Sequence, residues 1–349
     1  MSGTTAKAPL IHRLRERAGF SGGAAALRVR FIGVIVFQLL LVLVFTALAP
    51  RFFTWDNAQS ILFTAAILAI AAAGQTLVVL TGNLDLSVGS IMGLSAYVVF
   101  NIASGSPDLQ PFVILIAVVV GVVLGAANGF LVAVLKIPSI VATLGTLSIY
   151  RGIVSFYANA TEVTSGELPR WMRTLAETSW LGLSSYVWIA LVTIVVVGTM
   201  LRMLPWGRQI YAYGSNPKAA HFFGLNSTRI VIGAYVGAGV IAALVGLLLG
   251  ARVGNINSLL ASGIEMSVLA AVVIGGVSIW GGAGSVYGAA IGAIVLATIN
   301  NGLVILQVQE FYRLLLQGLA IVAAVAVDAV VQRRIQSATK RRRTMGADA

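Results

Sequence analysis

The 349-residue sequence contains no cysteine. A chain of this kind forms no disulfide, offers no thiolate to a metal ion and has no catalytic thiol. Histidine is scarce as well, because only His12 and His221 are present, one near the amino terminus and the other in a polar stretch. Two such distant histidines exclude a histidine-built metal centre within the apolar segments. We therefore expect no catalytic residue and no metal site on this chain.

Charge is also scarce. Charged residues make up only 10% of the sequence, hydrophobic residues make up 58%, and mean hydropathy is +0.95. A soluble domain of this length needs far more charge to cover its surface, so the composition predicts an all-α, polytopic transmembrane bundle. The net charge of +12 is concentrated in the terminal segments. Basic residues that flank spans orient a membrane protein and contact anionic lipid, so we expect the lipid bilayer, and not nucleic acid, as their partner.

Ten apolar segments come close to the roughly 20 residues that a helix needs to cross the hydrocarbon. They cover residues 31–49, 60–80, 86–104, 112–135, 139–157, 185–204, 230–250, 265–280, 285–306 and 312–331. The first segment is longer than the core of a signal peptide and many spans follow it, so we expect it to be retained. The sequence thus predicts a transmembrane domain over residues 31–331, between basic tails at 1–30 and 332–349.

The basic residues also predict the topology. Both tails are basic, so both termini are expected in the cytoplasm, which requires an even number of spans. Ten spans then place residues 205–229 inside as well. The segments 86–104, 139–157 and 265–280 have glycine or proline at or just before their starts, so each is a candidate for a broken or re-entrant helix. Eight spans are the alternative.

Two further patterns concern the outer side and the internal symmetry. The largest outer segment, 158–184, carries Trp171 and Trp180 and predicts a short amphipathic piece at the membrane interface. A weak similarity relates residues 80–96 to residues 273–293, because both place a glycine-rich turn between two apolar runs. Interrupted helices repeated in two halves are typical of transporters whose pathway lies at the repeat interface.

Three ionisable residues lie within or at the edges of the apolar segments. Asp85 is either a gate residue or the carboxylate that caps a helix starting at Leu86. Glu265 follows Ser262 at the spacing of a capping box, which is its alternative to a functional role. Arg151 either pairs with a carboxylate or snorkels toward headgroups, and snorkelling is the expectation.

Neutral polar residues on apolar segments either contact a neutral solute or form hydrogen bonds between helices, worth about 1 kcal/mol each. The adjacent amides Asn300 and Asn301 are the best candidates for the solute. The full set of permeation candidates is Gln75, Asn83, Asp85, Asn128, Thr143, Asn300 and Asn301. Thr146, Tyr150 and Thr298 are further neutral polar residues on apolar segments.

Glycines at every fourth position, at 121, 125 and 129 and again at 284, 288 and 292, predict close approach of helix backbones. The glycines at 275–284 superficially resemble a phosphate-binding loop. They lack the Gly-Lys-Ser/Thr ending, so we expect no ATP or other cofactor on this chain.

The polar, basic stretch 205–229 separates two long apolar runs. Its length fits a short helix across the end of the bundle, with turns at 214–217 and 224–226. In a membrane protein, a surface of this kind is where a soluble partner docks. A simple connector between spans is the alternative.

Four stretches resemble the membrane permease subunits of carbohydrate-type ABC importers, the group that contains ribose, xylose, rhamnose and autoinducer-2 permeases. They are residues 74–90 (GQTLVVLTGNLDLSVGS), 128–152 (NGFLVAVLKIPSIVATLGTLSIYRG), 207–226 (GRQIYAYGSNPKAAHFFGLN) and 269–293 (LAAVVIGGVSIWGGAGSVYGAAIGA). They occur in the family's order along nearly the whole chain. Asn83 departs from the family, whose members usually have glycine there. Residues 135–152 look most like the autoinducer-2 and rhamnose members.

The resemblance implies a multi-pass protein of the bacterial inner membrane that transports a monosaccharide or a similar small solute. It also implies three kinds of partner: a second permease subunit, identical or paralogous, two cytoplasmic ATPases that bind ATP with Mg²⁺, and a periplasmic solute-binding protein. The stretch 205–229 then resembles the family's coupling segment. Ala219 and Ala220 would let its short helix seat in a groove of the ATPase, and Arg208 and Lys218 would pair with acidic residues there. The implied coupling residues are Arg208, Tyr211, Gly214, Asn216, Lys218, Ala219, Ala220, Gly224 and Asn226.

Other function classes remain as alternatives. A branched-chain amino-acid permease would need charged partners for a zwitterionic solute, where this chain offers mostly amides. An ion-coupled secondary transporter would use Asp85 and Glu265 and no ATPase. A membrane scaffold has no need of interrupted, amide-bearing segments. An enzyme is disfavoured, because no nucleophile–base pair or metal cluster is present.

Overall fold

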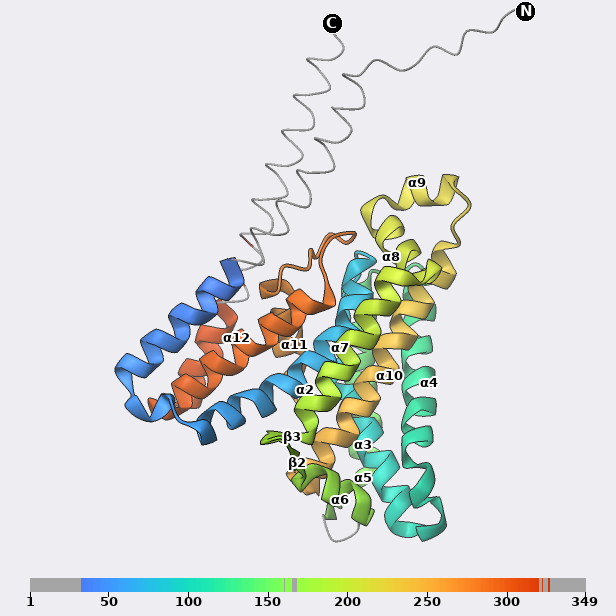
Figure 1. Ribbon diagram of the computed structural model, residues 1–349. Helices are drawn as coiled ribbons and strands as arrows, with labels where there is room; N and C mark the ends of the chain where they lie inside the picture. The colour runs from blue at the N-terminus through green and yellow to red at the C-terminus, as the bar shows by residue number, and fades with distance from the viewer. Residues whose placement is uncertain (1–32, 160, 165–167, 320–321, 323–325, 327–349) are drawn as a thin grey trace, which may run out of the picture.

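The structure is a computed structural model that describes residues 33–159, 161–164, 168–319, 322 and 326. Figure 1 shows long helices that run side by side, with short helices at both ends of the bundle. The predicted tails 1–30 and 332–349 lie outside the described residues, and so does part of the last apolar segment, 312–331.

Within the described residues, seven helices are long and apolar enough to cross a membrane. They are α2 (Trp55–Leu80), α3 (Val88–Gly105), α4 (Val113–Ala133, with the 3-10 turn η2 at Pro107–Phe112 before it), α5 (Ser139–Ala158), α7 (Ser185–Met203), α10 (Ser227–Val253) and α12 (Val286–Ile305). Two shorter apolar helices are Gly33–Leu48 and α11 (Ile264–Ile274). The predicted all-α, multi-pass membrane fold is confirmed, whereas ten as the number of spans stays a prediction.

The three segments suspected of being broken behave differently. The segment 265–280 is interrupted: α11 has 11 residues, about 16 Å at 1.5 Å per residue, and residues 275–285 form a glycine-rich loop before α12. The segments 86–104 and 139–157 form continuous helices α3 and α5. Pro138 is the N-cap of α5, where its missing N–H removes no helical hydrogen bond.

Glycines bring α4 and α10 into backbone contact along their length. A Cβ atom added at Gly121, Gly125 or Gly129 would collide with backbone atoms of α10. Gly239 of α10 meets the backbone of Gly121 and Gly125 in the same way. In lipid no hydrophobic effect drives helices together, so such close packing supplies much of the attraction. The second predicted face is confirmed in part: Gly288 and Gly292 of α12 touch the end of α11, whereas Gly284 lies in the loop before α12, with φ +131°.

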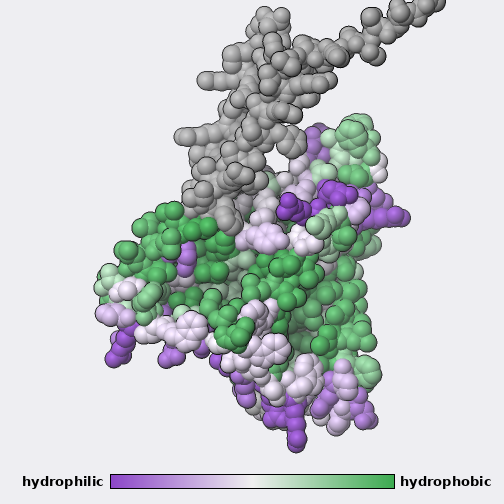
Figure 2. Space-filling model, viewed as in Figure 1, coloured by the Kyte–Doolittle hydropathy of each residue, from purple (hydrophilic) through white to green (hydrophobic). Residues whose placement is uncertain are grey.

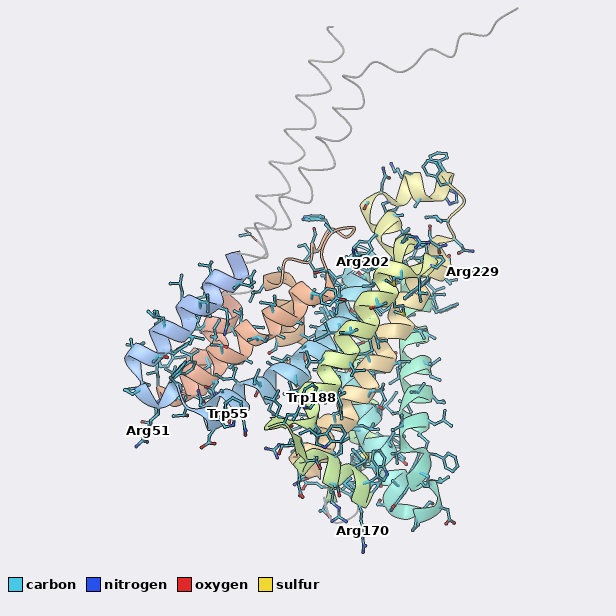
Figure 3. All side chains as sticks on the ribbon, viewed as in Figure 1. Arg51, Trp55, Arg170, Trp188, Arg202 and Arg229 are labelled. Carbon is cyan, nitrogen blue, oxygen red and sulfur yellow. The ribbon has the colours of Figure 1, made fainter. Side chains whose placement is uncertain are left out.

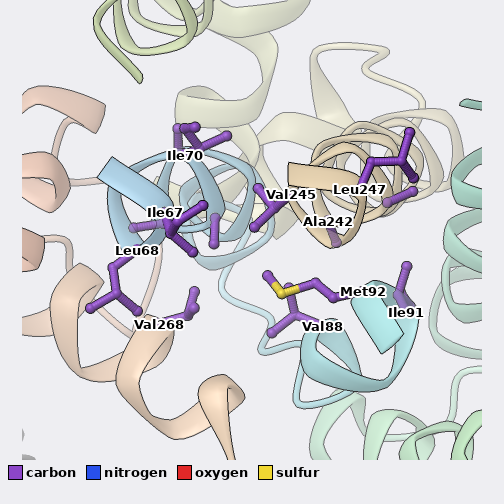
Figure 4. Close-up of a cluster of buried hydrophobic side chains, with 14 of the residues drawn as sticks. Ile67, Leu68, Ile70, Val88, Ile91, Met92, Ala242, Val245, Leu247 and Val268 are labelled. Carbon is purple, nitrogen blue, oxygen red and sulfur yellow. The ribbon is translucent and has the colours of Figure 1, made fainter. Parts of the chain in front are cut away.

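The carboxyl-terminal part of α2 is the centre of the core. Residues 65–80 are all buried, and α2 packs against α7, α10, α11 and α12. Figure 4 shows Ile67, Leu68 and Ile70 of α2 beside side chains of α3, α10 and α11, such as Met92 and Val245. A movement of α2 would therefore displace every one of these neighbours.

The two ends of the bundle are polar and the middle is apolar, as Figure 2 shows. At one end lie the short helix α6 (Arg170–Glu177) and the hairpin of β2 (Ser179–Trp180) and β3 (Leu183–Ser184); β1 (Val163–Thr164) pairs antiparallel with β4 (Asn255–Ile256). The helix α6 is the amphipathic piece predicted in the outer segment, with Met172 buried and Arg170 exposed. Figure 3 places Arg51 and Arg170 at this end, and Arg202 and Arg229 at the other.

The α4–α10 contact predicts that a glycine-to-alanine substitution changes the stability of the fold in opposite directions at two positions. Gly125→Ala places a methyl group against the backbone of α10 and should destabilise the fold by about 1–3 kcal/mol. Gly145→Ala makes the same change on α5, where nothing lies within 4 Å, and should be neutral or stabilising by up to about 1 kcal/mol through helix propensity. Thermal unfolding in detergent measures both, and equal effects would contradict the packing argument.

Candidate functional site: the inner end of the bundle and the α2–α3 turn

The polar stretch 205–229 folds into two short helices at one end of the bundle, α8 (Pro205–Ser215) and α9 (Pro217–Phe222) (Figure 1). Proline occupies the first position of each helix, where no N–H is needed. The side chain of Asn216 accepts a hydrogen bond from the Ala219 N–H at 3.0 Å, and that of Asn226 accepts from the Arg229 N–H at 3.0 Å. These asparagines are N-caps, so they determine where α9 and α10 begin.

The helix α8 is fixed to the bundle along one face. Ile210 is fully buried, and a Cβ atom on Gly207 would collide with the backbone of Leu201. The hydroxyl of Tyr211 donates a hydrogen bond to the carbonyl of Gly284 at 2.9 Å. Burial raises the pKa of this hydroxyl above its usual value, because the phenolate would lose its hydration. Tyr211 therefore stays a neutral donor to the glycine-rich loop.

Three segments meet where α8 ends, and we call this contact the inner junction. It consists of Gly214 of α8, residues 80–82 at the end of α2, and residues 281–284 of the glycine-rich loop. The N–H of Gly282 donates to the carbonyl of Leu80 at 2.9 Å. A side chain on Gly214 would collide with both of these groups. The two segments with the weak internal similarity, 80–96 and 273–293, therefore touch each other and α8 here.

The helix α9 projects from the bundle and exposes large side chains. Phe222 and Phe223 are 88% and 85% exposed. Arg208, Lys218 and His221 are also exposed. Neither phenylalanine is among the residues predicted from the sequence, although an adjacent aromatic pair in a polar segment was an available signal. An aromatic pair with basic neighbours is typical of a docking surface for a protein.

The structure qualifies the expectation for the two small residues of α9. Ala219 is partly exposed, but Ala220 is 4% exposed and faces its own chain. The carbonyl of Ala220 accepts a hydrogen bond from the Leu225 N–H at 3.0 Å. Ala220 thus packs α9 against the turn that leads to α10, and it does not present its methyl group to a partner.

Several permeation candidates converge on the turn between α2 and α3. The carboxylate of Asp85, which is 1% exposed, accepts hydrogen bonds from the N–H and the hydroxyl of Ser87 at 2.8 and 2.6 Å. Asn128 of α4 donates to the Ser87 hydroxyl oxygen at 2.7 Å, and Tyr150 of α5 donates to the Asn128 side-chain oxygen at 3.3 Å. Gln75 of α2 donates to the Asp85 carbonyl at 3.0 Å. We call these five side chains the turn cluster.

Further bonds tie the same turn to α5 and α10. The carbonyl of Leu84 accepts from the Tyr235 hydroxyl at 3.0 Å and lies 3.5 Å from the Thr143 hydroxyl. The Leu84 N–H donates to the Ser139 hydroxyl oxygen at 3.2 Å. Together with the turn cluster, these bonds connect one turn to four helices, α2, α4, α5 and α10.

The other permeation candidates lie apart. Asn83 makes a local bond to the Thr81 hydroxyl at 2.9 Å. Asn300 and Asn301 are on α12 and partly exposed, and the buried side-chain oxygen of Asn301 has no hydrogen-bond partner among the described residues. The sequence-predicted set therefore does not form one continuous line.

Two helix-start expectations are corrected. The helix α3 begins at Val88 and not at Leu86. The carboxylate of Asp85 accepts a hydrogen bond from the N–H of Ser87, which is the N-cap residue of α3. The capping box at Ser262 and Glu265 does not form, because the N-cap of α11 is Gly263 with φ +82°. Glu265 is left as an acidic residue in the first turn, where it favours the helix dipole.

Arg151 does not snorkel. Its guanidinium donates to the carbonyls of Ser258 and Leu260 at 3.0 and 2.8 Å. The guanidinium also lies against Gly93 of α3. Arg151 therefore ties α5 to the loop before α11.

The geometry defines the class of protein. A multi-pass bundle with one interrupted apolar segment, residues 265–280, ends in the polar helices α8 and α9, and α8 is hydrogen-bonded to the glycine-rich loop. This arrangement is typical of the membrane subunits of transporters. It offers no nucleophile–base arrangement among the described residues.

Comparison with known proteins gives the family. Residues 57–325 match the family described as "Branched-chain amino acid transport system / permease component". The autoinducer 2 import system permease protein LsrC of Photorhabdus laumondii is 36% identical over 278 residues, which are 80% of this chain and 83% of the relative. LsrC of Salmonella typhimurium is 34% identical over 297 residues, 85% of each chain, and LsrC of Klebsiella pneumoniae is 34% identical over 288 residues, 82% of this chain and 83% of the relative. No solved structure matches the chain.

The chain therefore belongs to the family of ABC importer permeases, and its relatives are of the carbohydrate type. It is a multi-pass protein of the inner membrane and a transport component, not an enzyme. The sugar-type reading agrees with these relatives better than the branched-chain amino-acid alternative does.

The inner junction generates a prediction at Gly214. Gly214→Ala places a methyl group on the Leu80 carbonyl, so α8 must shift, and the fold should lose about 1–3 kcal/mol of stability. Ala212→Ser, on an exposed position of the same helix, is the matched control and should change stability by less than about 0.5 kcal/mol. The measurement is thermal unfolding of the purified chain, and an unchanged midpoint for Gly214→Ala would contradict the contact.

Proposed function

We propose that this chain forms the membrane pathway of an importer for a monosaccharide or a similar small polyhydroxy solute, such as rhamnose, ribose or autoinducer-2. A second permease subunit, identical or paralogous, would complete the pathway. Two cytoplasmic ATPases would supply ATP and Mg²⁺ chemistry, and a periplasmic binding protein would deliver the solute. The similarity to LsrC proteins, which are named for autoinducer 2 import, supports this solute class.

The observation that carries the proposal is the inner junction. The Gly214 end of α8 contacts the last residues of α2 and the loop between α11 and α12 at once. Any displacement of α8 therefore acts on the most buried helix of the core and on the interrupted helix beside it. Alternating access needs such a connection, because a soluble motor can bias a membrane bundle only through groups that contact both.

The exposed face of α9 is the proposed docking surface for the ATPase. Phe222 and Phe223 supply apolar area, and Lys218 adds a positive charge on α9. The exposed Arg208 of α8 and Arg229 of α10 (Figure 3) add positive charge to the same end of the bundle. Buried aromatics contribute most of the binding energy at protein interfaces, whereas charges at the rim act mainly on partner choice and association rate. The caps Asn216 and Asn226 would hold this surface in shape.

Uptake measurements test the function. Cells with and without this gene are given labelled ribose, rhamnose, xylose and an autoinducer-2 analogue. We expect gene-dependent uptake of at least one of them that stops on ATP depletion and survives an uncoupler that spares ATP. Loss with the uncoupler while ATP is maintained would contradict the proposal and would favour ion coupling through Asp85 and Glu265.

Gly224 gives the sharpest test of the docking surface. It has φ +76°, with nothing within 4 Å of an added Cβ atom. Gly224→Arg strains the backbone by about 1–2 kcal/mol and adds a long charged side chain beside Phe223. We expect normal amounts in the membrane and uptake reduced by at least about tenfold, equivalent to roughly 1.4 kcal/mol.

Gly224→Asn is the matched control, because asparagine tolerates this left-handed conformation and is short. We expect it to keep most of the uptake. Normal uptake by Gly224→Arg would rule out docking at this turn.

A further inference from the structure

The outer half of α2 differs from its buried inner half. Asp56, Ser60 and Thr64 are all exposed. Their spacing of four residues places them on one face of the helix, in a row about 12 Å long at 1.5 Å per residue. A carboxylate facing lipid is strongly disfavoured, so this face must meet water, protein or solute.

The row borders a cavity of about 450 Å³, within the roughly 300–1,000 Å³ range of small-molecule sites. We call this cavity the outer vestibule. Its walls come from α2, the end of α6, the β2–β3 hairpin and the end of α10. They consist of Asp56, Gln59, Ser60, Phe63, Thr64, Ala176, Glu177, Thr178, Ser179, Ser184 and Arg252.

One wall is fixed to α2. The side chain of Gln59 donates to the carbonyl of Gly182 in the hairpin at 2.9 Å. The indole N–H of Trp188 donates to the Trp180 carbonyl at 3.1 Å. Figure 3 shows Trp55 and Trp188 at the same level of the bundle, where α2 begins beside the hairpin. The vestibule is thus bounded by ordered secondary structure.

The lining suits hydroxyl groups. The hydroxyls of Ser60 and Thr64 donate to the carbonyls of Asp56 and Ser60 at 3.0 and 3.1 Å, which leaves their oxygen lone pairs as acceptors. The guanidinium of Arg252 lies 5.0 Å from the centre of the Phe63 ring and forms no hydrogen bond with a described residue. It therefore has donors available.

The solute class follows from this inventory. Each hydroxyl of a polyol both donates and accepts, so it matches acceptors on α2 and donors on Arg252 at the same time. The lining carries the charged Asp56, Glu177 and Arg252. Only Phe63 and Ala176 are apolar, so it offers little surface to a branched apolar side chain. The two carboxylates add acceptors for hydroxyl groups. The lining therefore favours a polyhydroxy molecule over a branched-chain amino acid.

We propose that the outer vestibule is the site at which the solute first contacts the permease, with Ser60, Thr64 and Arg252 binding its hydroxyls. This proposal rests on the proposed import of a polyhydroxy solute. It adds binding residues and a location, at the outer ends of α2 and α10.

The absence of native cysteine allows a direct test, because a single introduced thiol is the only one on the chain. In the assembled transporter in intact cells or spheroplasts, Ser60→Cys and Thr64→Cys should react with a membrane-impermeant maleimide added outside. Solute-loaded binding protein should slow the reaction at least threefold. Ser95→Cys, at a fully buried position of α3, is the control that should not react.

Transport kinetics give the second readout. Thr64→Val and Arg252→Gln should raise the KM for uptake about tenfold, while the amount of the chain in the membrane stays unchanged. Thr193→Val is the matched control, since this hydroxyl of α7 also bonds the carbonyl four residues earlier, at 2.8 Å, and does not line the vestibule. We expect it to leave the KM unchanged.

The outcomes separate the two proposals. ATP-driven uptake by the unmodified chain, together with unreactive thiols and an unchanged KM in Thr64→Val and Arg252→Gln, would overturn the vestibule alone. Loss of uptake on addition of the uncoupler while ATP is maintained would overturn the importer function. The absence of gene-dependent uptake of any of the solutes would also overturn it. Protection of the thiols by leucine or valine, and not by a sugar, would overturn the assignment of a polyhydroxy ligand.

Discussion

Close backbone contact, made possible where a side chain is missing, is the constraint on which the structure depends. Helices in lipid gain little from hiding apolar surface, so they associate where their backbones can approach. Gly125 meets α10 in this way, Gly292 meets α11, and Gly214 meets the end of α2. Backbone contact at glycine therefore holds the core together and attaches the polar helix α8 to it. A single methyl group at any of these positions changes a distance between elements that are far apart in the sequence.

The sequence specified what depends on local pattern. The long apolar segments became helices, the glycines at every fourth position became contact faces, and the glycines after Ile274 ended α11. The asparagines at 216 and 226 became caps because their side chains reach N–H groups only three residues away. Each of these features is decided by residues within one or two helical turns.

Features that depend on distant residues could not be read in this way. Asp85 bonds to Ser87, and Ser87 is reached in turn by Asn128 of α4 and, through Asn128, by Tyr150 of α5, so the turn cluster follows only from the packed bundle. The capping box at Glu265 failed because Gly263 adopts a conformation that glycine accepts readily, and it displaced Ser262 as the N-cap. The outer vestibule was missed because the predicted span began at residue 60. The helix starts at Trp55, and only this longer helix aligns Asp56 with Ser60 and Thr64.

The length of α2 has a further consequence. Its 26 residues extend about 39 Å at 1.5 Å per residue, from the outer vestibule to the inner junction, without a proline. One continuous helix, long and apolar enough to cross a membrane, therefore joins the vestibule to the junction. Linkage requires that any effect of a cytoplasmic event on the outer site be matched by an equal effect of the outer site on that event. If the proposed solute site and the proposed cytoplasmic partner both act on α2, occupancy of the vestibule would bias the partner's equilibrium as strongly as the partner biases the vestibule.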